Sequence, residues 1–96
     1  MKIIIEAQDF EITSDLEYFV SARSKKLLRL PLTIAKIEIH LFESKVQHIT
    51  RKTCKTCLFT SSNKYFSEAH EKSYEMAIAL AIDDLDRKMQ NVRTAK

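Results

Sequence analysis

The sequence predicts one two-layer α+β domain, with a four-stranded sheet and two helices packed on one of its faces. Two amphipathic helical patterns, over residues 13–30 and 73–89, flank a region of three short segments with strand character. Consecutive strands joined by short turns form an antiparallel meander, and two helices must then cover one face of the sheet. The predicted order is therefore β-α-β-β-β-α. A chain of 96 residues is long enough for one such core and too short for two.

The first strand and the first helix are predicted from the start of the chain. Residues 2–6 (KIIIE) form a β-branched run, which is typical of a strand buried on at least one face. Thr13 and Ser14 are both candidate N-caps, and Ser14 together with Glu17 fits a capping box. Apolar residues then recur at helical spacing to about Leu30, where the following proline ends the helix.

Three strands joined by polar turns are expected in the middle of the chain, over residues 34–43, 49–59 and 64–69. In the first of them apolar and polar residues alternate, which predicts one packed face and one solvated face. In the second, Cys57 and Phe59 are expected to point into the core.

The second helix is predicted from an uninterrupted segment over residues 73–89. Its apolar residues recur at spacings of three and four and form one stripe: Tyr74, Ile78, Ile82, Leu85, Met89 and Val92. Acidic residues precede basic ones along its outer side, which is the order that the helix dipole favours. Two ion pairs at i,i+4 spacing are expected here, Asp83–Arg87 and Asp84–Lys88.

Composition and charge narrow the class of protein. The content of 45% hydrophobic and 30% charged residues is that of a soluble globular domain. No apolar run approaches the roughly 20 residues that span a bilayer, and the start of the chain is too short for a signal peptide. We therefore expect a cytoplasmic protein. The net charge is only +3, but residues 21–29, 45–55 and 87–96 each hold four bases and no acid. Such clusters attract polyanions such as nucleic acid, although each is also typical of a solvated surface.

The sequence holds no recognisable catalytic or metal-binding pattern. Cys54 and Cys57 form a CxxC motif, but they lie in a predicted strand, where positions i and i+3 point to opposite faces. Neither zinc nor redox chemistry is expected from them, and ordinary packing is the better interpretation. There is also no Gly-rich phosphate loop and no nucleophile–base pair. We expect a protein that is not an enzyme and that uses no cofactor and no small-molecule substrate.

The whole chain resembles the ribosome hibernation promoting factors, also called ribosome-associated translation inhibitors, in their short, sigma-54 modulation protein-like form. Two segments carry the resemblance, EITSDLEYFVSARSKKL at residues 11–27 and SYEMAIALAIDDLDRKM at residues 73–89. The resemblance implies a fold related to double-stranded-RNA-binding domains. It also implies one ribosome-binding domain over residues 1–96, without a C-terminal dimerisation domain.

The resemblance further implies a function and a partner. The expected partner is the small ribosomal subunit, through its rRNA and ribosomal proteins, in the channel that mRNA and tRNA otherwise occupy under stress or in stationary phase. The expected protein is a monomer that inhibits translation and preserves idle ribosomes. The expected RNA-binding residues form two arms, one in each helix: Arg23, Lys25, Lys26 and Arg29, and Arg87, Lys88, Arg93 and Lys96.

A second function stays open on the sequence alone. Phe42 and Tyr65 are candidates for an aromatic patch on the open face of the sheet. Such a patch is typical of a protein-interaction or homodimerisation module that does not bind RNA.

Overall fold

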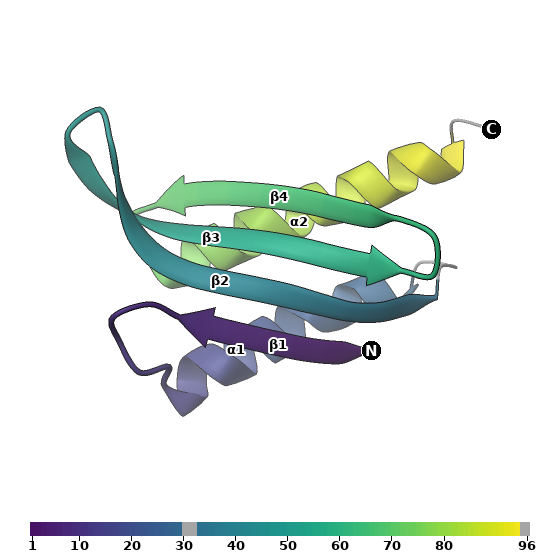
Figure 1. The fold of residues 1–96 in the computed structure, drawn as a ribbon, viewed down its shortest axis with the longest axis horizontal. Helices are drawn as coiled ribbons and strands as arrows, with labels where there is room; N and C mark the ends of the chain where they lie inside the picture. The colour runs from purple at the N-terminus through teal and green to yellow at the C-terminus, as the bar shows by residue number, and fades with distance from the viewer. Residues whose placement is uncertain (30–32, 95–96) are drawn as a thin grey trace.

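The predicted order of elements is confirmed. The computed structural model describes residues 1–29 and 33–94, with side chains as far as residue 90. The elements are β1 (Lys2–Ala7), α1 (Ser14–Ser24), the 3₁₀ helix η1 (Lys25–Arg29), β2 (Ile34–Val46), β3 (Ile49–Thr60), β4 (Lys64–Glu71) and α2 (Tyr74–Thr94). The strands form one sheet in the order β1-β2-β3-β4, in which β1 and β2 are parallel and the other neighbours are antiparallel. Both helices lie behind the sheet in Figure 1, so the face toward the viewer is open.

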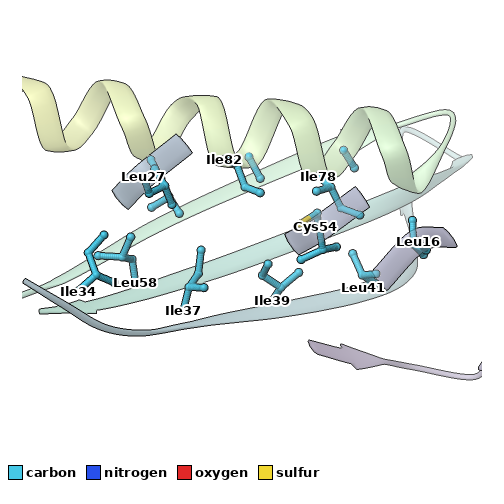
Figure 2. Packing of buried hydrophobic residues seen from close by; sticks show 14 of the residues in the cluster. Leu16, Leu27, Ile34, Ile37, Ile39, Leu41, Cys54, Leu58, Ile78 and Ile82 are labelled. Carbon is cyan, nitrogen blue, oxygen red and sulfur yellow. The ribbon is translucent and has the colours of Figure 1, made fainter. Parts of the chain in front are cut away.

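The core lies between α2 and the sheet, as Figure 2 shows. Four residues of the predicted stripe are at most 1% exposed: Ile78, Ile82, Leu85 and Met89. At its start, Tyr74 stacks on Phe10 with ring centroids 4.7 Å apart. The side chain of Val92 lies outside the described residues. The stripe prediction is thus confirmed over its described length.

The prediction of the inward positions on β3 is wrong. Cys57 and Phe59 are only partly buried and lie on the open face, whereas Cys54, Thr56 and Leu58 face the helices. The strand register explains why Leu58 and not Cys57 faces the core. Leu58 pairs with Ile37 of β2 and with Tyr65 of β4, and both of these residues contact the core.

A polar contact inside the core explains why the inward positions of β3 do not follow an alternation of apolar and polar residues in the sequence. Thr56 is 3% exposed, and its hydroxyl is hydrogen-bonded to that of Ser67 on β4. The Ser67 hydroxyl in turn donates to the carbonyl oxygen of Ala81 in α2, at 2.7 Å. Ala81 is itself fully buried, and its small side chain lets the helix backbone come this close to the sheet. A buried hydroxyl with partners costs little, so a threonine is tolerated where an apolar residue is expected.

The aromatic residues of β4 are also distributed differently from the prediction. Tyr65 packs against the core cluster and does not share the open face with Phe42. Its neighbour Phe66 points the other way, because successive side chains of a strand alternate between faces. Phe66 is 60% exposed.

The first helix begins one residue earlier than a capping box at Ser14 requires. Thr13 has extended backbone angles, and its hydroxyl oxygen accepts the amide proton of Leu16 at 3.1 Å. Thr13 is therefore the N-cap, and the predicted box with Glu17 does not form because the third residue of the helix is Leu16.

The assignment of Thr13 as the N-cap predicts how its replacement changes the stability of the protein. Thr13→Ala should lower the free energy of unfolding by about 1 kcal/mol, since one amide at the helix start loses its acceptor. Urea denaturation measures this loss. Ser14→Ala is the matched control and should leave stability nearly unchanged. Equal losses in the two variants would contradict the assignment of the cap.

Candidate nucleic-acid interface

The first basic group lies where α1 changes into η1. The predicted helix is α-helical only as far as Ser24, a 3₁₀ helix follows to Arg29, and Leu30 lies outside the described residues. In a 3₁₀ helix residues i and i+3 lie on one side, so Lys26 aligns with Arg29. Leu27 is fully buried and fixes this short helix to the core, while Lys25 and Lys26 are exposed.

Lys25 and Lys26 are the cations of this group that have no partner among the described residues. Arg29 has one, because its guanidinium lies 2.9 Å from the carboxylate of Asp86 and joins η1 to α2. Arg23 is partly buried, with its guanidinium carbon 5.2 Å from the centre of the Phe19 ring. Both arginines thus already contribute to packing, whereas the two lysines are available to an external anion.

The second basic group, on α2, is more strongly neutralised. The Lys88 ammonium lies 3.1 Å from Asp84, which confirms the predicted i,i+4 pair. Arg87 also pairs with Asp84, at 3.6 Å and i,i+3 spacing, so the predicted pair with Asp83 is wrong. Lys88 further donates a hydrogen bond of 2.6 Å to the carbonyl oxygen of Phe66. It therefore covers part of the free edge of β4, a common way to protect an exposed strand.

The structure brings only part of the predicted surface together. The Arg29–Asp86 ion pair holds η1 beside α2, whereas Lys88 reaches from α2 toward β4. The side chain of Arg93 and all of Lys96 lie outside the described residues. Lys25 and Lys26 are thus the most available cations among the predicted residues that the structure describes.

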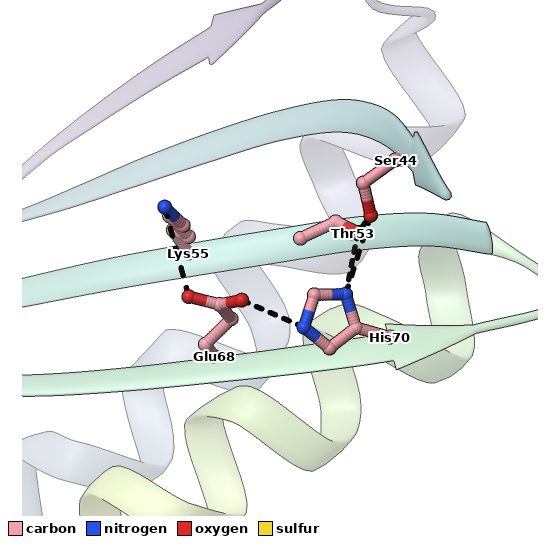
Figure 3. A network of polar contacts seen from close by, with 5 residues as sticks. All are labelled: Ser44, Thr53, Lys55, Glu68 and His70. Atoms are coloured by element: carbon pink, nitrogen blue, oxygen red, sulfur yellow. Dashed lines mark hydrogen bonds and ion pairs between the residues drawn. The ribbon is translucent and has the colours of Figure 1, made fainter. Parts of the chain in front are cut away.

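A polar network, which the sequence analysis did not identify, crosses the open face of the sheet (Figure 3). His70 Nδ1 lies 2.8 Å from the Thr53 hydroxyl, and its Nε2 lies 2.6 Å from the Glu68 carboxylate. Glu68 is also 3.7 Å from the Lys55 ammonium. The order hydroxyl, imidazole, carboxylate is also found in hydrolases, but Thr53 is fully buried and cannot meet a substrate. The network joins β2, β3 and β4, since Ser44 also contacts Thr53.

The two cysteines lie on opposite faces of the sheet, as their spacing predicts. Cys54 is buried under the helices, and Cys57 is partly buried on the open side. The described residues hold no group of three or more His, Cys, Asp or Glu side chains that could bind a metal ion. None of the helices in this part of the chain is long and apolar enough to cross a membrane.

The burial of Cys54 predicts that the free energy of unfolding decreases at alkaline pH. Burial raises the pKa of its thiol from about 9 to about 12, so the folded state keeps the proton that the unfolded chain releases. The stabilisation is complete below pH 9 and is lost as the pH rises toward 12, by about 1 kcal/mol at pH 10. Unfolding curves of wild type and Cys54→Ala between pH 7 and 10.5 measure this difference. Parallel pH profiles would contradict the assigned cause.

Solved structures of other proteins share this α+β fold. A ribosomal subunit interface protein from Coxiella burnetii has a TM-score of 0.82 at 14% identity, covering 98% of this chain and 99% of its own. The N-terminal domain of Protein Y from Thermus thermophilus has a TM-score of 0.77 at 17% identity, covering 96% of this chain and 99% of its own. At these identities the likeness shows the fold alone. No curated protein matches the chain.

The sequence itself matches a family model. The model described as "Sigma 54 modulation protein / S30EA ribosomal protein" matches residues 3–96. The chain therefore belongs to this family, which agrees with the resemblance found in its two helices.

Proposed function

We propose that this protein binds the small ribosomal subunit in the channel for mRNA and tRNA, and that it keeps idle ribosomes inactive under stress or in stationary phase. The observation that carries the proposal is the match of the family model to residues 3–96. The similarity in fold to a ribosomal subunit interface protein supports it. In this proposal the protein acts in the cytoplasm as a monomeric single domain, without a cofactor, a small-molecule substrate or a chemical reaction.

Electrostatic contact with rRNA phosphates provides the binding energy in this proposal. Lysine and arginine side chains that neutralise phosphates release counterions, which makes the affinity fall steeply with salt. Folded RNA is recognised mainly by its shape and its backbone. Lys25 and Lys26 are the main contacts that we propose, because they are exposed and have no partner in the described part of the chain.

The remaining predicted residues have smaller roles in this proposal. Arg23 and Arg29 contact the phosphates next to those of the two lysines. On the second arm, Arg87 and Lys88 exchange part of their contact with Asp84 for RNA, which lowers their net contribution. Arg93 and Lys96 are further phosphate contacts in this proposal.

Competition with the natural ligands of the channel tests this function. Small subunits saturated with the protein should lose their affinity for an mRNA and initiator tRNA, because the proposed sites overlap. Filter binding with labelled tRNA measures the effect. Undiminished tRNA binding by saturated subunits would place the protein elsewhere or exclude the function.

A further inference from the structure

The open face of the sheet carries an exposed aromatic ring that the proposed function does not use. Phe66 is 60% exposed and lies beside Cys57 of β3, which pairs with Glu38 of β2. Figure 1 looks onto this face, and neither helix covers it. Exposed apolar surface marks a binding site where it is contiguous, so the surroundings of this ring decide its meaning.

Phe66 borders a shallow hollow of about 360 Å³ on this face. Phe42 and Cys57 provide its other apolar surface, and polar atoms come from Glu38, His40 and Lys55. Apolar surface with a few convergent polar groups is typical of a site for a small ligand. The polar network of Figure 3 holds one wall of the hollow in place. Lys55, which lines the hollow, pairs with Glu68, and Glu68 in turn contacts His70.

Positive charge lies at one end of the hollow. The ammonium groups of Lys36 and Lys64 are 4.5 Å and 5.3 Å from the centre of the Phe59 ring, which pairs with both residues across the sheet. Lys36 is partly neutralised by Glu38 at 3.3 Å. Lys64 has no carboxylate partner among the described residues. An anionic group near Lys64 would therefore meet an uncompensated cation next to the aromatic surface.

We infer that this open face binds single-stranded RNA, with one unpaired base stacked on Phe66 over the hollow and its phosphate near Lys64. Aromatic side chains combined with basic ones on an open surface are the usual platform for unpaired nucleotides. The choice of RNA over DNA rests on the proposed function.

A second copy of the chain fits this face less well than RNA does. A face-to-face dimer would bury the ion pairs Lys55–Glu68 and Lys36–Glu38, and the Glu6 carboxylate beside His40, between two sheets. Removing these charges from water is costly, and the exposed large apolar side chains that the described part of this face offers in return are only Phe66 and, at the turn between β2 and β3, Val46 and Ile49. A nucleotide strand leaves most of the charges hydrated.

Fluorescence anisotropy with a labelled oligouridine of about 12 nucleotides tests the inference. Phe66→Ala should weaken binding about tenfold, whereas Phe66→Tyr should retain it, because stacking needs only an aromatic ring. Tyr18→Ala is the matched control: Tyr18 is 76% exposed but lies on α1, behind the sheet, and its loss should not change the affinity. Urea denaturation checks that all three variants are folded.

Several outcomes would overturn the inference. They are equal binding by wild type and Phe66→Ala, an equal loss in Tyr18→Ala, and no binding of the oligouridine at low salt. Tighter binding of a matching oligothymidine DNA would overturn the choice of RNA. Light scattering that shows a dimer, converted to a monomer by Phe66→Ala, would identify a second copy as the occupant. Binding to small subunits is measured separately, so a failure here is distinguishable from a failure of the proposed function.

Discussion

Replacing Lys25 and Lys26 together by glutamate is expected to weaken binding to the small ribosomal subunit on the order of a hundredfold, because two charge-assisted phosphate contacts become repulsions. Stability should hardly change, since both side chains are exposed and have no partner among the described residues. The neighbouring Leu27 keeps η1 attached to the core in the variant. Titration of labelled protein with small subunits at fixed salt measures the loss.

A control with the same change in net charge separates a specific contact from general attraction. Lys45 and Lys72 are also exposed and without a partner in the described residues, but they lie outside the predicted arms. The variant Lys45→Glu/Lys72→Glu should lose much less affinity than the variant in η1. Equal losses in the two double variants would show that binding depends on overall charge, and the proposed role of Lys25 and Lys26 would be wrong.

The largest expected effect on stability comes from the stripe of α2. Ile82→Ala should lower the free energy of unfolding by about 2–5 kcal/mol, because it leaves a cavity between the helix and the sheet. Ile82 is 1% exposed and lies in the centre of the packing that Figure 2 shows. The loss is a large part of the roughly 5–15 kcal/mol that stabilises a typical domain. Chemical denaturation followed by circular dichroism measures it.

Leu80→Ala is the matched control for Ile82→Ala. Leu80 lies on the same helix but is 45% exposed, so its truncation should change stability by no more than about 0.5 kcal/mol. A loss in Leu80→Ala as large as that in Ile82→Ala would mean that α2 does not pack on the sheet through the predicted stripe.

The sequence was sufficient for the features that depend on strong periodicity. The spacing of Ile78, Ile82 and Leu85 defined the buried side of α2, and the alternation from Ile37 to Leu41 defined the packed face of β2. Such patterns repeat over several turns or strand positions, so one exception does not hide them. The order of elements followed from these patterns and was confirmed.

The inward face of β3 and the exposed ring of β4 could not be predicted with the same rules. Thr56 occupies a core position because Ser67 and the Ala81 carbonyl satisfy its hydroxyl through a chain of hydrogen bonds. These partners lie on β4 and α2, so the local sequence pattern of β3 does not predict them. The sequence alone therefore predicts the more apolar Cys57 and Phe59 as the inward residues.

The state of each basic side chain also depends on tertiary contacts. Arg29 and Asp86 are 57 residues apart in the chain, yet they form an ion pair. Lys88 finds the carbonyl oxygen of Phe66 on an edge strand. The basic clusters are visible in the sequence, but only the fold distinguishes paired cations from the available Lys25 and Lys26.

Sedimentation of the purified protein with small ribosomal subunits through sucrose gradients tests the central proposal most directly. At low salt the wild-type protein should migrate with the subunits, and at high salt it should remain at the top of the gradient, since phosphate contacts weaken as salt increases. Folded wild-type protein that stays at the top of the gradient at low salt would contradict the proposed function.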